Sequence, residues 1–185
     1  MPKLSQGDIF AAVAERRADL AIIFGHIGFN YMHLSWCTFR DSVPRLANLR
    51  DPFTGIQGRA ERIAEGRWLW FVKEGKNHGL TDGQVISALD SALSWATSAG
   101  VRSVITNGIA DVDGGRDCGR NRISNDRRAR LLIQYAAEQE KARGLGIELV
   151  SLNSVFTRNS TLSDGLAHLQ TPAVSGTKSI GKCRL

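Results

Sequence analysis

Apolar runs and helical periods alternate along the chain between residues 7 and 156. The run Leu20–Phe24 is apolar at every position, which is typical of a strand buried on both faces of a sheet. The segment RWLWFV at 67–72 is rich in aromatic and β-branched residues and also predicts a strand. Residues 81–100 have a helical apolar period that begins with a capping-box pair, Thr81 and Gln84. The alternation predicts an α/β sandwich with a largely parallel central sheet.

The end of the chain differs in composition from the rest. Ser, Thr and Gly dominate residues 157–185, and the charge of this segment is positive. Such a segment buries little apolar surface, so we expect a basic tail that is partly disordered or bound to a partner. The whole chain has 185 residues, of which 42% are apolar, enough for one sizeable core. We therefore expect a single α/β domain over residues 1–156.

The sequence also indicates where the protein works. It has no apolar stretch long enough to cross a bilayer, and its first ten residues lack the order of regions found in a secretion signal. Cys37, Cys118 and Cys183 are far apart and form no C-x-x-C pair, so we expect neither a zinc site nor a redox dithiol. These features predict a cytoplasmic protein with free thiols, no metal, no cofactor and no membrane partner.

A formal net charge of +6 favours anionic partners through long-range attraction, without specifying the anion. Arginines are dense in the segment 116–130, where Arg120, Arg122, Arg127 and Arg128 could form one basic surface. One function that stays open is therefore a non-enzymatic protein that binds nucleic acid or an acidic protein, such as an accessory inhibitor from a mobile element.

A glycine-rich loop, NGIADVDGGRDCGRNR at 107–122, follows a predicted strand and leads into a predicted helix. Ligands of open α/β sheets bind at such places, where glycines let backbone amides approach a phosphate and arginines can hydrogen-bond to it. The spacing matches neither G-x-G-x-x-G nor the Walker pattern. A phosphate loop and a solvated surface loop both stay open. We expect no metal at Asp111, Asp113 and Asp117, because the distant glutamate of an EF-hand is absent.

A second loop with candidate chemistry follows the strand at 20–24. His26, Asn30 and His33 can polarise a carbonyl, orient a water or transfer a proton near neutral pH. No G-x-S-x-G elbow accompanies them, so structural roles stay open beside catalytic ones. Of the four tryptophans, Trp36 is the best candidate to lie near a ligand, because the others fall within predicted helices or strands.

Five stretches follow one another with characteristic spacing: QGDIF at 6–10, ADLAIIFGHIG at 18–28, FRDSVP at 39–44, WLWFVKEGKNHG at 68–79 and ISALDSALSWATSAGVRSVITNGIADVDGG at 86–115. In this order they resemble the macro domain, an ADP-ribose-binding module, and especially its branch of DNA ADP-ribosyl glycohydrolases paired with toxins. The resemblance covers about residues 6–156. It implies a three-layer α/β/α sandwich with a mixed, largely parallel central sheet.

The resemblance further implies that the chain binds ADP-ribose, or a related nucleotide-derived phosphate ligand, in a cleft between two strand-end loops. Asp8 would contact the adenine amine, the loop from Gly25 to His33 would wrap the distal ribose, and the loop that starts at Asn107 would cradle the diphosphate. The implied ligand-binding residues are Asp8, Gly25, Gly28, His33, Asn107, Gly108, Gly114, Gly115 and Arg116.

The resemblance leaves two activities open, binding alone and hydrolysis of an ADP-ribosyl bond. His26 occupies the place of the family's catalytic asparagine. In a hydrolase, His26 or Asn30 would position the attacking water and Asp113 would act as the base.

Overall fold

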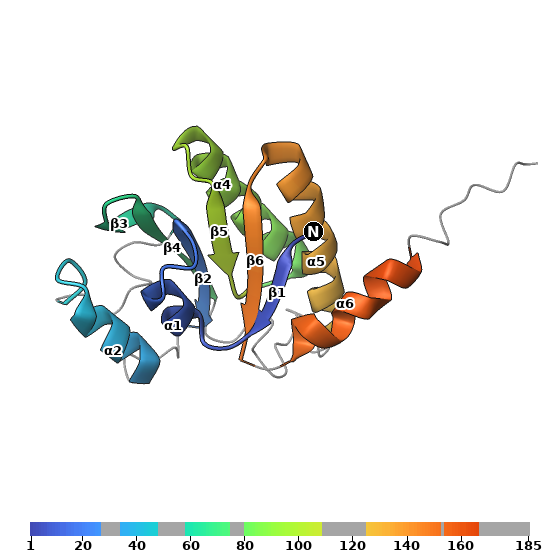
Figure 1. The fold of residues 1–185 in the computed structure, drawn as a ribbon, viewed down its shortest axis with the longest axis horizontal. Coiled ribbons are helices and arrows are strands. Elements are labelled where there is room, and N and C mark those ends of the chain that lie inside the picture. Colours follow the sequence, from blue (N-terminus) through green and yellow to red (C-terminus); the bar gives the residue numbers. More distant parts are fainter. Residues whose placement is uncertain (27–33, 48–57, 75–79, 109–124, 153, 167–185) are drawn as a thin grey trace, which may run out of the picture.

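The computed structural model describes residues 1–26, 34–47, 58–74, 80–108, 125–152 and 154–166. Within these residues, six strands form one sheet (Figure 1). In chain order they are β1 (Lys3–Gln6), β2 (Leu20–His26), β3 (Ala60–Ala64), β4 (Arg67–Glu74), β5 (Ser103–Thr106) and β6 (Gly146–Ser151). Their order across the sheet is β1-β6-β5-β2-β4-β3. All neighbours are parallel except β3 and β4, which are antiparallel.

Helices cover both faces of this sheet. The described helices are α1 (Ile9–Ala14), α2 (Leu34–Ser42), α4 (Asp82–Ser98), α5 (Asn125–Arg143) and α6 (Val155–Leu166). The first two pack with Ala21 and Ile23 of β2 in one core cluster, and the other three pack with Leu20, Ile22 and Phe24 in a second cluster. The predicted three-layer α/β/α sandwich with a mixed, largely parallel sheet is therefore confirmed.

Strand β2 is the centre of the core because it lies between β5 and β4 and has a helical layer on each face. Leu20, Ile22 and Ile23 are completely buried. This position explains why the segment lacks the polar–apolar alternation of a strand with one solvated face. On β4, Trp68 and Trp70 pack on the α4 side and Leu69 on the α1 side, as the alternation of side chains along a strand requires.

Two strands differ from the sequence prediction, which contained neither β1 nor β3. Both lie at the edges of the sheet. The side chains of β1 are only half-buried or exposed, and β3 buries Ile63 alone among its residues. Edge strands need little apolar surface, so short polar segments such as KLSQ and AERIA give no strand signal.

The predicted boundary at residue 156 lies inside α6, which continues to Leu166. Val155 and Phe156 of this helix are fully buried in the core cluster on the α4 and α5 side. Residues 167–185 of the predicted tail lie outside the described residues. Among the helices of the described ranges, none has the length and apolarity needed to cross a membrane.

Candidate functional site

The carboxyl ends of five parallel strands meet at one edge of the sheet. These ends are Gln6 of β1, His26 of β2, Glu74 of β4, Thr106 of β5 and Ser151 of β6. The helices that follow in the chain return from this edge, so α4, α5 and α6 begin there and direct their positive dipole ends toward it. The edge therefore favours an anionic ligand, and ligands of open α/β sheets bind at such edges.

Asp8 lies at the β1 end of this edge and is the N-cap of α1. Its Oδ1 accepts hydrogen bonds from the backbone N–H groups of Phe10, at 2.7 Å, and Ala11, at 3.1 Å. Its Oδ2 accepts no hydrogen bond from the described residues. One carboxylate oxygen thus holds the helix, and the other keeps its capacity to accept a hydrogen bond from a ligand.

Leu152 follows β6 next to this position and is not among the predicted site residues. It is 54% exposed, which is unusual for a large apolar side chain among the described residues. Its carbonyl oxygen accepts a hydrogen bond of 3.2 Å from the side chain of Gln6, and the N–H of Gly7 donates to the carbonyl of Ser151 at 2.8 Å. These bonds tie the ends of β1 and β6 together, so Leu152 offers an apolar surface close to Asp8.

Asn107 follows β5 and is only 7% exposed. Its Nδ2 donates a hydrogen bond of 3.0 Å to the carbonyl oxygen of Phe24, and its Oδ1 accepts one of 2.9 Å from the N–H of Phe24. The side chain predicted to bind ligand therefore bonds to the backbone of β2. A direct contact between Asn107 and a ligand stays a prediction.

Gly108 turns the chain away from the sheet with a φ of +53°, a left-handed conformation that favours glycine. Its N–H donates to Thr106 Oγ1 at 3.2 Å. A Cβ atom at this position would lie 2.5 Å from Leu132 Cδ1 of α5. Two independent features, the backbone angle and the approach of Leu132, favour glycine where the predicted phosphate loop begins.

Gly25 and His26 end β2 and pair with Lys73 and Glu74 of β4. Gly25 is buried. The backbone of His26 is thus placed at the carboxyl edge, but its side chain lies outside the described part of the structure. Several other predicted site residues also lie outside the described residues: Gly28, Asn30, His33, Asp113, Gly114, Gly115, Arg116, Arg120 and Arg122.

The burial of Arg128 contradicts part of the predicted basic surface. Its side chain is 4% exposed, and its Nε donates to Asp82 Oδ1 at 2.9 Å while Nη2 donates to the carbonyl of Leu80 at 2.6 Å. This buried ion pair joins the first turns of α4 and α5, so the prediction that Arg128 contacts a partner is wrong. Arg127 is 75% exposed and lies 3.5 Å from the same carboxylate.

A second charged group fixes α6 to the first turn of α5. Asp126 Oδ1 accepts hydrogen bonds from Asn159 Nδ2 at 2.7 Å and from Arg158 Nε at 2.9 Å. Asn159 is 2% exposed, and its Oδ1 accepts a 3.3 Å hydrogen bond from Arg130. The hydrogen bonds from Asn159 and Arg158 lower the pKa of Asp126 below its ordinary value. The sequence does not predict this cluster, because Arg158 and Asn159 belong to the segment 157–185, which is predicted to be a tail.

Trp36 has a packing role in the described structure. It is completely buried, with its ring 5.4 Å from that of Phe10 and 5.7 Å, edge to face, from that of Phe71. The expectation that Trp36 lies near a ligand finds no support in these contacts. Among the described residues, its Nε1 has no hydrogen-bond partner.

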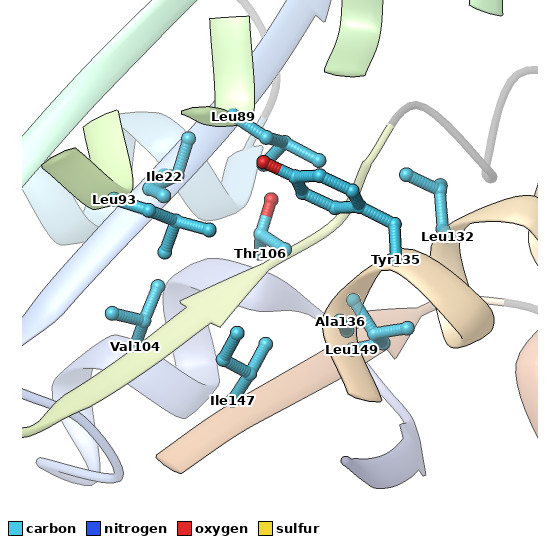
Figure 2. A pocket seen from close by; sticks show the side chains of 10 residues that line it. All are labelled: Ile22, Leu89, Leu93, Val104, Thr106, Leu132, Tyr135, Ala136, Ile147 and Leu149. Atoms are coloured by element: carbon cyan, nitrogen blue, oxygen red, sulfur yellow. The ribbon is translucent and has the colours of Figure 1, made fainter. Parts of the chain in front are cut away.

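A small cavity lies beneath the edge, between the sheet and helices α4 and α5 (Figure 2). The Tyr135 ring extends from α5 over Thr106 toward Leu89 of α4. The cavity volume is about 10 Å³, and the surface that lines it is apolar. A single water needs roughly 10–15 Å³. This cavity therefore has no room for a nucleotide.

The described ranges contain no group of three or more His, Cys, Asp or Glu side chains arranged to hold a metal ion. Asp111, Asp113 and Asp117, at which the sequence predicts no metal, lie outside these ranges.

No family model and no curated protein matches this chain. Its structure is similar to the macrodomain of Thermus aquaticus DarG, with a TM-score of 0.48 and 13% sequence identity over 83% of this chain and 98% of that one. It is also similar to the bottromycin maturation enzyme BotP in complex with Mn, with a TM-score of 0.43 and 16% identity. That match covers 80% of this chain and only 30% of BotP. A macrodomain is thus among the solved structures that this chain resembles, as the sequence predicts. Both TM-scores are below 0.5, so the likeness assigns neither a ligand nor an activity to this chain.

The Gly108 turn gives a test of the site's backbone. Gly108→Ala should lower the free energy of unfolding by about 1–3 kcal/mol, because alanine disfavours the left-handed φ and its Cβ would displace Leu132. Gly83→Ala is the matched control, since Gly83 is exposed in the first turn of α4 with open space around it. It should raise the stability by about 0.5 kcal/mol. Urea unfolding measures both, and equal effects of the two substitutions would show that the turn at Gly108 does not need glycine.

The Asp126 cluster predicts a pH dependence of stability. Because the folded-state pKa lies below the ordinary value of 3.8, the carboxylate stabilises the fold above about pH 4 and loses this contribution as the pH falls through the lowered pKa. Asp126→Asn should therefore be less stable than the wild type at neutral pH, and the difference should shrink as the pH falls below 3.8. Unfolding free energies measured across this range check it. A difference that stays constant with pH would contradict the ion-pair account.

Proposed function

We propose that this chain binds ADP-ribose, or a related nucleotide-derived diphosphate, along the carboxyl edge of its sheet. The proposal rests chiefly on the order of strands. Going across the sheet from β1 through β6 and β5 to β2, the edge presents Asp8, then Leu152, then Gly108, then Gly25. The resemblance to macro domains assigns Asp8 to the adenine, Gly108 to the diphosphate and Gly25 to the distal ribose. The spatial order of the contacts thus follows the chemical order of the ligand.

The span of the edge also supports an extended ligand. The path from β1 to β2 crosses β6 and β5. With neighbouring strands roughly 4.8 Å apart, its ends are separated by about 14 Å. That length favours a ligand with a sugar at each side of a diphosphate over a single mononucleotide.

At the β1 end, Asp8 and Leu152 supply the two interactions that a purine base needs. The Oδ2 atom of Asp8 accepts a hydrogen bond from the exocyclic amine of adenine. The exposed side chain of Leu152 packs against the base and removes apolar surface from water. Neither interaction disturbs the cap, because Oδ1 alone bonds to the first turn of α1.

At the centre of the edge, the diphosphate would lie over Gly108 and close to the first turn of α5. A helix N-terminus stabilises negative charge there, and backbone N–H groups can donate to phosphate oxygens. We assign the further phosphate contacts to Gly114, Gly115 and Arg116, following the resemblance. The distal ribose would lie beyond β2, with Gly25, Gly28 and His33 around it.

Hydrolysis is a separate activity from binding. For a ligand attached to an acceptor through its distal ribose, we assign the orientation of water to His26 or Asn30 and the acceptance of its proton to Asp113. Release of ADP-ribose from ADP-ribosylated DNA assays this step independently of affinity.

The test of the binding proposal separates the two oxygens of Asp8. Asp8→Asn keeps a capping oxygen, so the stability should stay within about 0.5 kcal/mol of the wild type. The second oxygen becomes an NH₂ group, which cannot accept a hydrogen bond from adenine. Calorimetry should show ADP-ribose affinity reduced by about tenfold or more, the cost of one mismatched hydrogen bond. The same variant should gain affinity for inosine diphosphate ribose, whose base presents an acceptor in place of the amine.

Asp8→Ser is the control for the cap, because serine also caps helices but has no second oxygen. It should lose affinity for ADP-ribose without gaining any for the inosine ligand. The binding proposal fails if folded wild-type protein gives no heat with millimolar ADP-ribose. The assignment of Asp8 fails if Asp8→Asn binds both ligands as the wild type does.

A further inference from the structure

At its carboxyl end, strand β2 extends beyond the end of its neighbour β5. The β5 ladder ends where Thr106 pairs with Ile22, whereas pairing with β4 continues to the end of β2 at His26. Within the described residues, the last part of β2 therefore has a strand partner on one side only. A parallel strand that loses one neighbour leaves backbone N–H and C=O groups to be satisfied in another way.

The side chain of Asn107 fills this gap. A primary amide carries a donor and an acceptor in one plane, as a peptide group does. Both groups of Asn107 bond to the same residue: Nδ2 donates to the carbonyl oxygen of Phe24, and Oδ1 accepts from the N–H of Phe24. The side chain of Asn107 thus continues the β2–β5 ladder beyond Thr106 and takes the place of a backbone peptide group. The two residues are 83 positions apart in the chain and both are buried.

The backbone next to this contact is equally constrained. Gly108 follows directly, and its turn is held by the hydrogen bond to Thr106 and by the approach of Leu132. Gly25 follows Phe24 on the other strand and is held by its pairing with β4. The hydrogen bonds between Asn107 and Phe24 therefore join the end of β5, which is held by Thr106 and Leu132, to the end of β2, which is held by its pairing with β4.

We propose that Asn107 is a positioning residue of the ligand edge. It acts through the backbone of Phe24 to set the spacing between the end of β5 and the end of β2. This inference rests on the proposed function, in which the first end holds the diphosphate and the second holds the distal ribose. It gives the side chain of Asn107 a role different from the direct ligand contact that the resemblance implies.

Two substitutions at this position probe the bond. Asn107→Ala removes both hydrogen bonds and leaves two buried backbone groups of Phe24 without partners. Asn107→Asp keeps the shape but loses the donor, and it places a carboxylate beside the carbonyl oxygen of Phe24. Val101→Ala is the control, since Val101 is a buried residue two positions before β5, on the side opposite the ligand edge.

The first readout uses two ligands. ADP contains the adenine and diphosphate but lacks the distal ribose, so only ADP-ribose spans both strand ends. Calorimetry should show that wild-type protein prefers ADP-ribose to ADP, and that Asn107→Ala and Asn107→Asp reduce this preference at least fivefold. General destabilisation in Val101→Ala should leave the preference unchanged, because it affects both ligands alike.

The second readout needs no ligand. In the free protein, hydrogen exchange of the Phe24 amide, measured by NMR, should be at least tenfold faster in Asn107→Ala than in the wild type. The amide of Ile22, which lies within the β5 ladder, should keep its exchange rate relative to the rest of the core. Val101→Ala should not change the ratio of the two rates.

The outcomes separate this inference from the proposed function. Failure of wild-type protein to bind ADP-ribose overturns the function, while the exchange experiment still tests the bond between Asn107 and Phe24. An unchanged preference for ADP-ribose over ADP in both Asn107 variants overturns the positioning role. Loss of preference with an unchanged Phe24 exchange rate also overturns it, because Asn107 would then act by touching the ligand.

Discussion

The parallel alignment of β2 with β5 and β4 is the constraint on which the rest of the structure depends. A strand with neighbours on both sides and helices over both faces must be apolar throughout, and Leu20–Phe24 meets that requirement. Parallel pairing then brings all the connections that leave the carboxyl ends to one edge. Asp8, Gly25, Gly108 and Leu152 lie along that edge because the backbone ladders have this direction, although they come from distant parts of the sequence.

Much of the fold could be predicted because local chemistry specifies it. The apolar run of β2, the capping box of α4 and the cap at Asp8 all depend on neighbours within a few positions, and the structure contains each of them. The edge strands β1 and β3 could not be predicted, because they are short and largely polar and gain their order from pairing with β6 and β4.

The site was only partly predictable for a related reason. The residue types at Asn107 and Arg128 were noticed, but their partners are 83 and 46 positions away in the chain. The sequence alone does not distinguish a side chain that bonds within the fold from one that faces a ligand. Leu152 gave no signal in the sequence, because an apolar residue close to Leu149 and Val150 is expected to be buried with them. The charge of the chain was also a poor guide to its surface, because several arginines pair with carboxylates, including Arg17 with the buried Glu148.

The most direct test of the proposed site is an NMR titration of isotope-labelled protein with ADP-ribose. If the ligand lies along the carboxyl edge in the order of the strands, the amide signals of Asp8, Leu152, Gly108 and His26 should shift together with one dissociation constant. The signals of Gly66, Gly100 and Gly144, which precede β4, β5 and β6 at the opposite edge, should stay in place. Shifts confined to that opposite edge, or no shifts in the folded protein, would contradict the account.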